Sequence, residues 1–189
     1  MGISREEFSD ILRKKFESSY LKLNDIPTLD LYIDQITTLF DESLSDRKRS
    51  EDEKILTKTM VNNYSKEKIL LPIKSKKYSR EHIIQMSMIY LMKQTLSIQD
   101  IKQIFSCEES SSLTSFEKVY ENFMLFDEEY KDRMANFFSA FCEKIDTENP
   151  EELLASMLYL CYVSSTLQRV VETLIDKHIT YIEPTKDKK

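Results

Sequence analysis

Glycine occurs only once in this chain of 189 residues, at position 2. Phosphate-binding loops of the GxGxxG and GxxxxGKS/T types need several glycines, so neither can be built here. Enzymes with nucleotide-binding folds are therefore not expected, although a phosphate could still bind at a helix N-terminus. Together with a charged-residue content of 32%, the scarcity of glycine favours an all-α fold.

The remaining composition is that of an ordinary globular protein. Hydrophobic residues make up 41% of the chain, and the length is enough to bury a core in one or two domains. The three cysteines, Cys107, Cys142 and Cys161, form no Cys-x-x-Cys motif, and their odd number indicates reduced thiols. The longest apolar run, residues 157–163, is far shorter than the ~20 residues that span a bilayer. The charged N-terminus lacks the apolar core of a signal peptide, so a cytoplasmic protein is predicted.

Charge is distributed unevenly along the chain. The formal net charge is −6, yet residues 47–105 carry thirteen Lys or Arg and six Asp or Glu, a net of +7. This asymmetry predicts one basic module with acidic companions, or else lysine-rich loops that are only solvated. The serine-rich stretch 106–112 is predicted to be a linker. An acidic helical domain at residues 113–180 and a disordered tail at residues 181–189 are expected to follow it.

Residues 57–105 have the most informative pattern, which predicts three helices with a lysine-rich loop after the first. Thr57, Ser79 and Ser97 are the candidate N-caps of the three helices. An apolar plug at residues 69–71 follows the first helix, which Pro72 prevents from continuing. The apolar faces of the three helices are formed by Met60, Val61 and Tyr64; by Ile83, Met86, Ile89, Tyr90 and Met92; and by Ile98, Ile101, Ile104 and Phe105.

Several of these residues resemble the DNA-binding domain of MerR-type regulators. The matching residues are Tyr64, Ile69-Leu70, Pro72, Tyr78-Ser79-Arg80-Glu81 and Leu96-Ser97-Ile98. Asn62 stands where that family usually has an arginine, and Lys68 where a glycine normally ends the recognition helix. More closely, residues 26–105 are similar to an uncharacterised bacterial family built on a MerR-like helix-turn-helix. The resemblance implies a winged helix-turn-helix domain at residues 26–106.

The basic segment suits duplex DNA physically, because a short helix can enter the ~12 Å major groove while flanking lysines pair with phosphates. Asn62 and Asn63 are candidates for base-edge contacts, unless one of them serves as a cap or turn residue. The candidate phosphate contacts are Lys58, Lys66, Lys68, Lys74, Lys76, Lys77 and Arg80. His82, in the first turn of its helix, either touches a phosphate or is merely solvated. The polar stretch 43–53 adds phosphate contacts through its basic residues 47–49, or is only a surface loop.

Two further helices are predicted before the basic segment. Ser4 and Glu7 have the spacing of a capping box, which starts a helix over about residues 4–19 within an N-terminal unit of residues 1–25. A second helix, over about residues 29–43, stands where the resemblance requires the first helix of the helix-turn-helix. Its apolar face is formed by Leu29, Tyr32, Ile33, Ile36, Leu39 and Phe40.

Three helices are predicted in the acidic domain. Two aromatic-rich ones cover about residues 116–126 and 127–145, and Asn149 caps a third helix that could run to about His178. Apolar residues of the third helix recur at alternating spacings of four and three, as in a heptad seam. The candidate dimerisation residues of the seam are Leu153, Met157, Leu160, Leu167, Val171 and Leu174. The seam closes a three-helix bundle within the chain, pairs with a second copy, or does both.

Catalytic and metal-binding chemistry find little support in this sequence. Only His82 and His178 are available as histidines, and nothing in the spacing brings either beside a nucleophilic Cys or Ser. Metal ligation needs several converging ligands, which the cysteine and histidine positions do not indicate. We therefore expect no enzyme activity, no metal and no cofactor. The expected function is a DNA-binding transcription regulator whose C-terminal helices dimerise or bind an effector or partner; the alternative is a protein-interaction adaptor on a degenerate helix-turn-helix scaffold.

Overall fold

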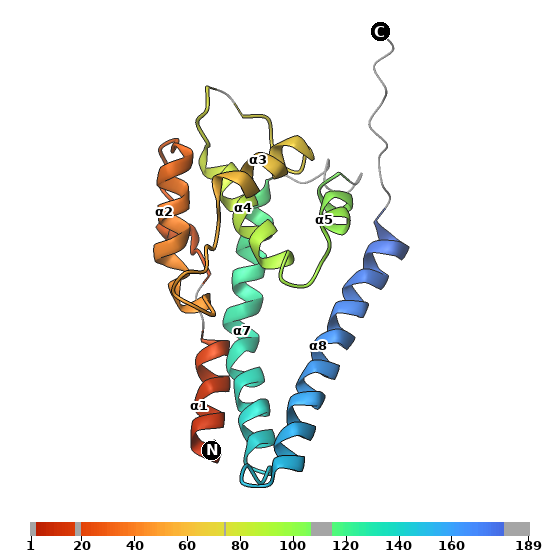
Figure 1. Cartoon of the computed structure of the whole chain (residues 1–189). Coiled ribbons are helices and arrows are strands. Elements are labelled where there is room, and N and C mark those ends of the chain that lie inside the picture. Colours follow the sequence, from red (N-terminus) through yellow and green to blue (C-terminus); the bar gives the residue numbers. More distant parts are fainter. Residues whose placement is uncertain (1–2, 18–19, 74, 107–114, 180–189) are drawn as a thin grey trace.

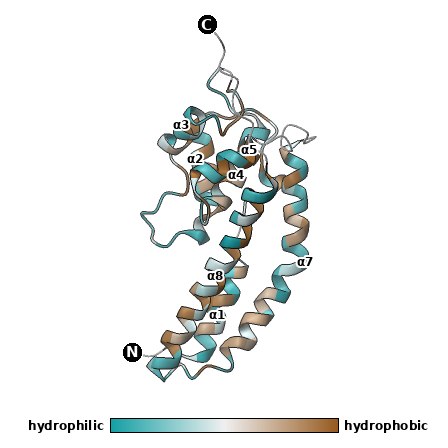
Figure 2. Cartoon of the chain, turned by 90° about the vertical axis from the view of Figure 1, so that its right-hand side faces the viewer, coloured by the Kyte–Doolittle hydropathy of each residue, from teal (hydrophilic) through white to brown (hydrophobic). Residues whose placement is uncertain are grey.

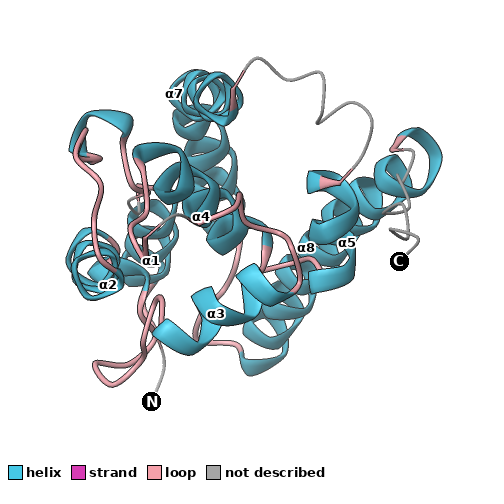
Figure 3. Ribbon diagram, turned by 90° about the horizontal axis from the view of Figure 1, so that it is seen from above, coloured by secondary structure: helices cyan, strands magenta, loops and turns pink. Residues whose placement is uncertain are grey.

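The computed structural model of the chain describes residues 3–17, 20–73, 75–106 and 115–179. Within these ranges the regular structure is helical, apart from one isolated β-bridge between Leu31 and Tyr78. The predicted all-α class is thereby confirmed, as Figures 1 and 3 show.

Nine helical elements are described in those ranges. The α-helices are α1 (Arg5–Phe16), α2 (Ile33–Ser43), α3 (Lys58–Lys66), α4 (Arg80–Met92), α5 (Ile98–Phe105), α7 (Phe116–Cys142) and α8 (Pro150–His178). The 3₁₀ helices are η1 (Leu23–Asp25) and η2 (Ser45–Arg47). We call residues 20–105, which contain η1, η2 and α2 to α5, the head, and helices α1, α7 and α8 the stalk.

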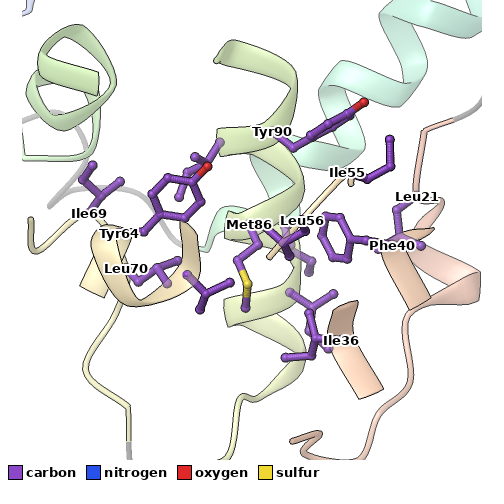
Figure 4. Packing of buried hydrophobic residues seen from close by; sticks show 14 of the residues in the cluster. Leu21, Ile36, Phe40, Ile55, Leu56, Tyr64, Ile69, Leu70, Met86 and Tyr90 are labelled. Carbon is purple, nitrogen blue, oxygen red and sulfur yellow. The ribbon is translucent and has the colours of Figure 1, made fainter. Parts of the chain in front are cut away.

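The head is organised around α4, which is buried on nearly every side. Its first two turns place a polar residue, Gln85, among the apolar core side chains, and Ile83 and Met86 are fully buried. A helix that is hydrophobic all round belongs in a core, and α4 receives side chains from α2, α3 and the upper part of α7. Figure 4 shows part of this core: Leu21, Ile36, Phe40, Ile55, Leu56, Tyr64, Ile69, Leu70, Met86 and Tyr90.

Several predicted helix starts are confirmed by hydrogen bonds. The hydroxyl of Thr57 accepts the backbone N–H of Met60, and the hydroxyl of Ser97 accepts that of Asp100. The side-chain oxygen of Asn149 accepts the N–H of Glu151, beside a proline at the first helical position. These caps depend only on residues close in sequence, which is why the pattern locates them.

Two predicted helix boundaries are wrong. The helix predicted to start near residue 29 begins at Ile33, because the backbone of Leu31 pairs with Tyr78 and the side chain of Leu29 is 76% exposed. The two helices predicted at residues 116–126 and 127–145 are one continuous helix, α7. The Asp-Glu-Glu stretch at residues 127–129 has the composition of a helix start, but acidic residues are equally compatible with a helix interior.

The stalk joins the head at the upper end of α7 and extends away from it (Figure 1). The guanidinium of Arg80 donates to the Glu117 carboxylate at 2.9 Å and also bonds the carbonyl of Ile26. Helix α1 packs along the lower part of α7, where the rings of Phe16 and Phe138 stack at 5.5 Å. These contacts fix α1 and α7 to each other and to the head.

Helix α8 leaves α7 after their connecting turn, and the two helices diverge toward the head (Figures 1 and 2). The rings of Phe141 and Tyr159 meet near the turn at 5.1 Å, and at the other end Ile175 is buried in the head core. Between those ends α8 keeps many exposed apolar side chains. None of the helices in the described ranges combines the length and apolar character needed to cross a lipid bilayer.

Candidate nucleic-acid interface

Helix α3 packs one apolar edge against the head core and exposes one polar face to solvent. Val61 and Tyr64 are buried, while Asn62, Asn63 and Lys66 are exposed. Both asparagines lie inside the helix, so neither is a cap or turn residue. The helix therefore exposes two side-chain amides and a lysine to solvent, while its opposite side is packed against the head core.

A helix-ending motif built on Lys68 closes α3. Lys68 has a positive φ of 58°, and the backbone N–H of Ile69 donates to the carbonyl of Tyr64 at 2.9 Å. The N–H of Lys68 donates to the carbonyl of Ser65 at 3.1 Å, which completes the Schellman pattern. Glycine is the usual residue at this left-handed position, so a lysine there carries a conformational cost.

The apolar plug after α3 is fixed by a side chain that the sequence pattern does not single out. Gln85, only 2% exposed, donates to the carbonyl of Ile69 at 2.7 Å and accepts the N–H of Leu71 at 2.9 Å. A buried amide with both ends satisfied holds a loop in one position, because leaving either end unpaired is costly. Gln85 thus sets the position of the chain between α3 and residues 72–79, which we call the lysine loop.

The lysine loop runs from the plug to α4, and its base is anchored. Tyr78 and Leu31 exchange two backbone hydrogen bonds of 2.9 Å, and the Lys77 ammonium lies 5.4 Å from the centre of the Tyr32 ring. Ser75 and Lys76 have positive φ values of 53° and 58°. In Figure 1 the loop and α3 lie at the same end of the molecule, opposite the turn between α7 and α8. Lys74 lies outside the described residues.

One of the candidate lysines has an acidic neighbour, since Lys58 forms an ion pair with Asp34. Lys102, which is not one of the candidates, pairs with Glu67 at 3.2 Å. Exposed ion pairs of this kind contribute little to stability, and their lysines can exchange partners at small cost. Of the candidate lysines that the structure describes, Lys58, Lys66, Lys68, Lys76 and Lys77 are exposed.

Two candidates from the sequence make contacts within the protein, and one of them, His82, is buried. His82 is 8% exposed, and its Nδ1 accepts the N–H of Ser79 at 3.2 Å, so its prediction as a phosphate-contacting or solvated residue is wrong. Arg80 is occupied by Ile26 and Glu117 at the joint between head and stalk. Both assignments rest on position in a helix start, which does not reveal the long-range partners that enclose it.

The basic stretch 47–49 is also remote from α3. It follows η2, where the Lys15 ammonium approaches the carbonyl of Asp46 at 3.5 Å, so this loop lies beside α1. Lys48 pairs with Asp41 at 3.2 Å. The loop is therefore a separate surface, away from the end that carries α3 and the lysine loop (Figure 1).

Several other hollows occur among the described residues. An apolar pocket of about 320 Å³ lies where the end of α4 faces α7 and α8, lined in part by Met92, Phe123 and Val171. Among the described residues, no cluster of three or more His, Cys, Asp or Glu side chains could hold a metal ion. Burial raises the pKa of the Cys142 thiol, and Cys161 is exposed.

The geometry defines an all-helical protein with a compact head that is basic at one end and a long helical stalk. The chain belongs to the family described as Domain of unknown function (DUF1836), whose match covers residues 21–123, more than half of the chain. That range begins at a buried core residue of the head, Leu21, and includes the first turns of α7. The boundary predicted at residues 106–112 stays a prediction. No curated protein and no solved structure shows significant similarity to the chain.

Proposed function

We propose that this protein is a cytoplasmic, sequence-specific duplex-DNA-binding transcription regulator. In this proposal α3 contacts the bases and the lysine loop contacts the phosphates. The observation that carries this proposal is the outward face of α3, where Asn62 and Asn63 are exposed between Lys58 and Lys66. Asparagine can form paired hydrogen bonds with adenine in the major groove, and lysines beside it can neutralise phosphates. The resemblance to MerR-like helix-turn-helix domains supports the same assignment.

Rigidity of the interface also supports this proposal. Thr57 caps the start of α3, the Schellman motif closes its end, and Gln85 fixes the following plug. Base readout requires side chains held within a fraction of an ångström of their contacts, which elements locked by capping and supporting hydrogen bonds provide. Lys58 and Lys77 lie near an acidic and an aromatic side chain, respectively, yet both remain exposed. The stalk helices would serve dimerisation or partner binding.

The second candidate is an adaptor that binds proteins and not DNA. It is favoured by the carboxylates of Asp34 and Glu67, which pair with Lys58 and Lys102 and offset their positive charges. It is also favoured by the exposed apolar side chains of α7 and α8. An adaptor requires neither an exposed asparagine pair nor a basic loop beside it. The two candidates therefore differ in a direct way, since only the regulator binds duplex with an affinity that depends on salt.

The test is DNA binding by the full-length purified protein. Fragments bound from a random duplex pool define a preferred sequence, and fluorescence anisotropy at several salt concentrations gives the slope of log affinity against log salt. Each phosphate neutralised contributes a slope of about 0.9. Changing Lys76→Ala with Lys77→Ala should reduce the slope by about 1.8 and weaken binding to every sequence. Asn62→Ala should change the preferred sequence instead.

A matched control removes two lysines from the stalk instead. Lys14→Ala with Lys144→Ala changes the net charge by the same amount but alters exposed positions on α1 and just after α7. It should leave affinity and slope nearly unchanged. No binding at low salt, or equal losses in the two double variants, would reject the regulator and leave the adaptor.

A further inference from the structure

The apolar pocket between the end of α4 and the two long stalk helices is a cavity of about 320 Å³. Its walls come from three parts of the chain that are far apart in the sequence: α4 with the turn after it, α7 and α8. The lining residues are Met88, Leu91, Met92, Thr95, Leu96, Tyr120, Phe123 and Val171. Protein interiors contain few voids larger than a water molecule. This hollow is therefore larger than an ordinary packing defect.

The attachment of α8 keeps the cavity open. Near the α7 turn the ring of Tyr159 packs on that of Phe141 at 5.1 Å, and at the other end Ile175 is buried in the head core. The side-chain amide of Gln103, on α5, also donates to the carbonyl of Ile179 at 3.2 Å. Because α8 is held at both ends, it cannot close onto the end of α4 without breaking these contacts. The cavity is therefore a preformed feature of the fold, at the place where α7 and α8 diverge (Figures 1 and 2).

The chemistry of the walls selects a neutral, apolar ligand. Six of the eight lining residues are Met, Leu, Phe or Val, and none of the eight carries a charge. Both hydroxyls of the lining are already used within the chain. That of Tyr120 donates to the carbonyl of Leu21 at 2.8 Å, and that of Thr95 donates to the carbonyl of Met92 at 3.4 Å. A charged ligand would lose water here without gaining an ion pair from the walls, which is unfavourable.

The volume of the cavity indicates the size of the ligand. Small-molecule sites have volumes of about 300–1,000 Å³, and an apolar cavity of about 150 Å³ holds benzene. Two methionines, Met88 and Met92, line the wall on α4, and the flexible methionine side chain adapts well to aromatic rings. Thr95 and Val171 are exposed, so a ligand can enter on their side. The cavity therefore has room for a molecule of roughly one or two rings.

We propose that this cavity binds a small, neutral, apolar molecule that contacts the head and both stalk helices at once. The proposal is independent of DNA binding, because the cavity lies between the end of α4 and the stalk and contains no residue of α3. Val171, which is one of the predicted dimerisation residues, is 40% exposed and lines this cavity. In this proposal Val171 contacts the ligand instead of a second subunit.

Titration of the full chain with toluene, followed by NMR of isotope-labelled methionine methyl groups, tests the site. The signals of Met88 and Met92, on the cavity wall, should shift together and saturate. Met134 and Met157 are internal controls, because they are 39% and 51% exposed on apolar parts of α7 and α8 outside the cavity. Their signals should stay in place. No shift at Met88 and Met92, or equal shifts of all four signals, would overturn the proposal.

A pair of tryptophan variants tests whether toluene occupies the cavity itself. Val171→Trp should weaken toluene binding by about tenfold or more, because the indole takes the space of the ligand. The matched control Val170→Trp alters the neighbouring position, which is 51% exposed and does not line the cavity, so it should leave the affinity nearly unchanged. Both positions are exposed, so neither variant should disturb the core. Equal affinities of the two variants would place toluene elsewhere and overturn the assignment.

Benzoate tests the chemical class of the ligand. It has the same ring as toluene but carries a carboxylate in place of the methyl group. Because none of the lining residues is a cation, benzoate should bind at least about tenfold more weakly than toluene in the same titration. Benzoate that binds as tightly as toluene, or more tightly, would contradict a site for neutral molecules.

Discussion

The head and the stalk use apolar residues in opposite ways. In the head, the side chains of Ile36, Phe40, Ile83 and Met86 are fully buried around α4. In the stalk, Phe126, Leu154, Leu158 and Tyr162 are more than 60% exposed. The head therefore completes its hydrophobic core within one chain, whereas the stalk has large apolar side chains that the described residues leave exposed. This difference means that any association of the chain through apolar surface would involve the stalk more than the head.

The extent of the family match agrees with this division. It covers residues 21–123, which include nearly all of the head and the part of α7 that packs against it. Tyr120, on that part of α7, is 1% exposed and donates a hydrogen bond to the carbonyl of Leu21 at 2.8 Å. The first turns of α7 thus belong physically to the head, although the helix continues into the stalk.

The largest expected contrast is between one core residue of the head and one exposed residue of the stalk. Phe40→Ala leaves a cavity at a fully buried position and should lower the free energy of unfolding by about 3–5 kcal/mol. Leu125→Ala, on the outer face of α7, should change it by less than about 0.5 kcal/mol. Urea unfolding followed by circular dichroism measures both. Comparable losses would contradict the proposed division between a closed head and an open stalk.

The features that sequence patterns predict correctly are those that depend on neighbours along the chain. Thr57, Ser97 and Asn149 are recognisable as caps because a cap bonds an amide two or three residues away. The buried edge of α3 follows from helical spacing in the same way. Hence helix class, several helix starts and the asparagine pair of the candidate interface can be predicted from local sequence alone.

Features that depend on distant partners are missed or misplaced by the same reasoning. His82 is enclosed by the head, and Arg80 is bound to Glu117, 37 residues away. The pairing of Leu31 with Tyr78 delays the start of α2, because that segment forms a bridge with the base of the lysine loop. The sequence pattern does not indicate that Gln85 is buried, since a polar residue on a helix usually faces solvent. A single glutamine does not reveal which backbone groups it will bond.

The junction between head and stalk should affect how the free energy of unfolding changes with pH in the alkaline range. Burial, together with the carboxylates of Asp127 and Glu128, raises the pKa of Tyr20 to about 12, and burial raises the pKa of Tyr120 as well. The folded state then keeps protons that the unfolded chain releases near pH 10, so stability is retained below pH 10 and falls as pH rises toward 12. Both rings lie at the junction, 6.4 Å apart.

Tyr120→Phe tests this expectation. It should cost about 1 kcal/mol at neutral pH, because it removes the hydrogen bond to Leu21. It should also make the fall above pH 10 less steep, since one tyrosine with a raised pKa is gone. Urea unfolding between pH 8 and pH 11.5, values chosen to bracket the ordinary tyrosine pKa of about 10, measures both effects. Tyr130→Phe, at a half-exposed site of the stalk, is the control and should leave the curve unchanged. Identical curves for all three proteins would contradict a buried tyrosine at the junction.

The smallest expected effect concerns the conformational free energy that a lysine costs at the left-handed position that ends α3. Lys68 has a left-handed backbone that glycine adopts without strain, so Lys68→Gly should stabilise the head by about 0.5–1 kcal/mol. The control Lys66→Gly, within the helix, should instead destabilise it by up to about 1 kcal/mol. If Lys68 contacts a phosphate, the stabilised variant should also lose about 0.9 of the salt slope of DNA binding. Such a variant, more stable but weaker on DNA, would show that this end of the head gives up stability to keep a positive charge. A gain in stability with an unchanged slope would remove Lys68 from the interface, and no gain in stability would show that the motif closing α3 carries no strain.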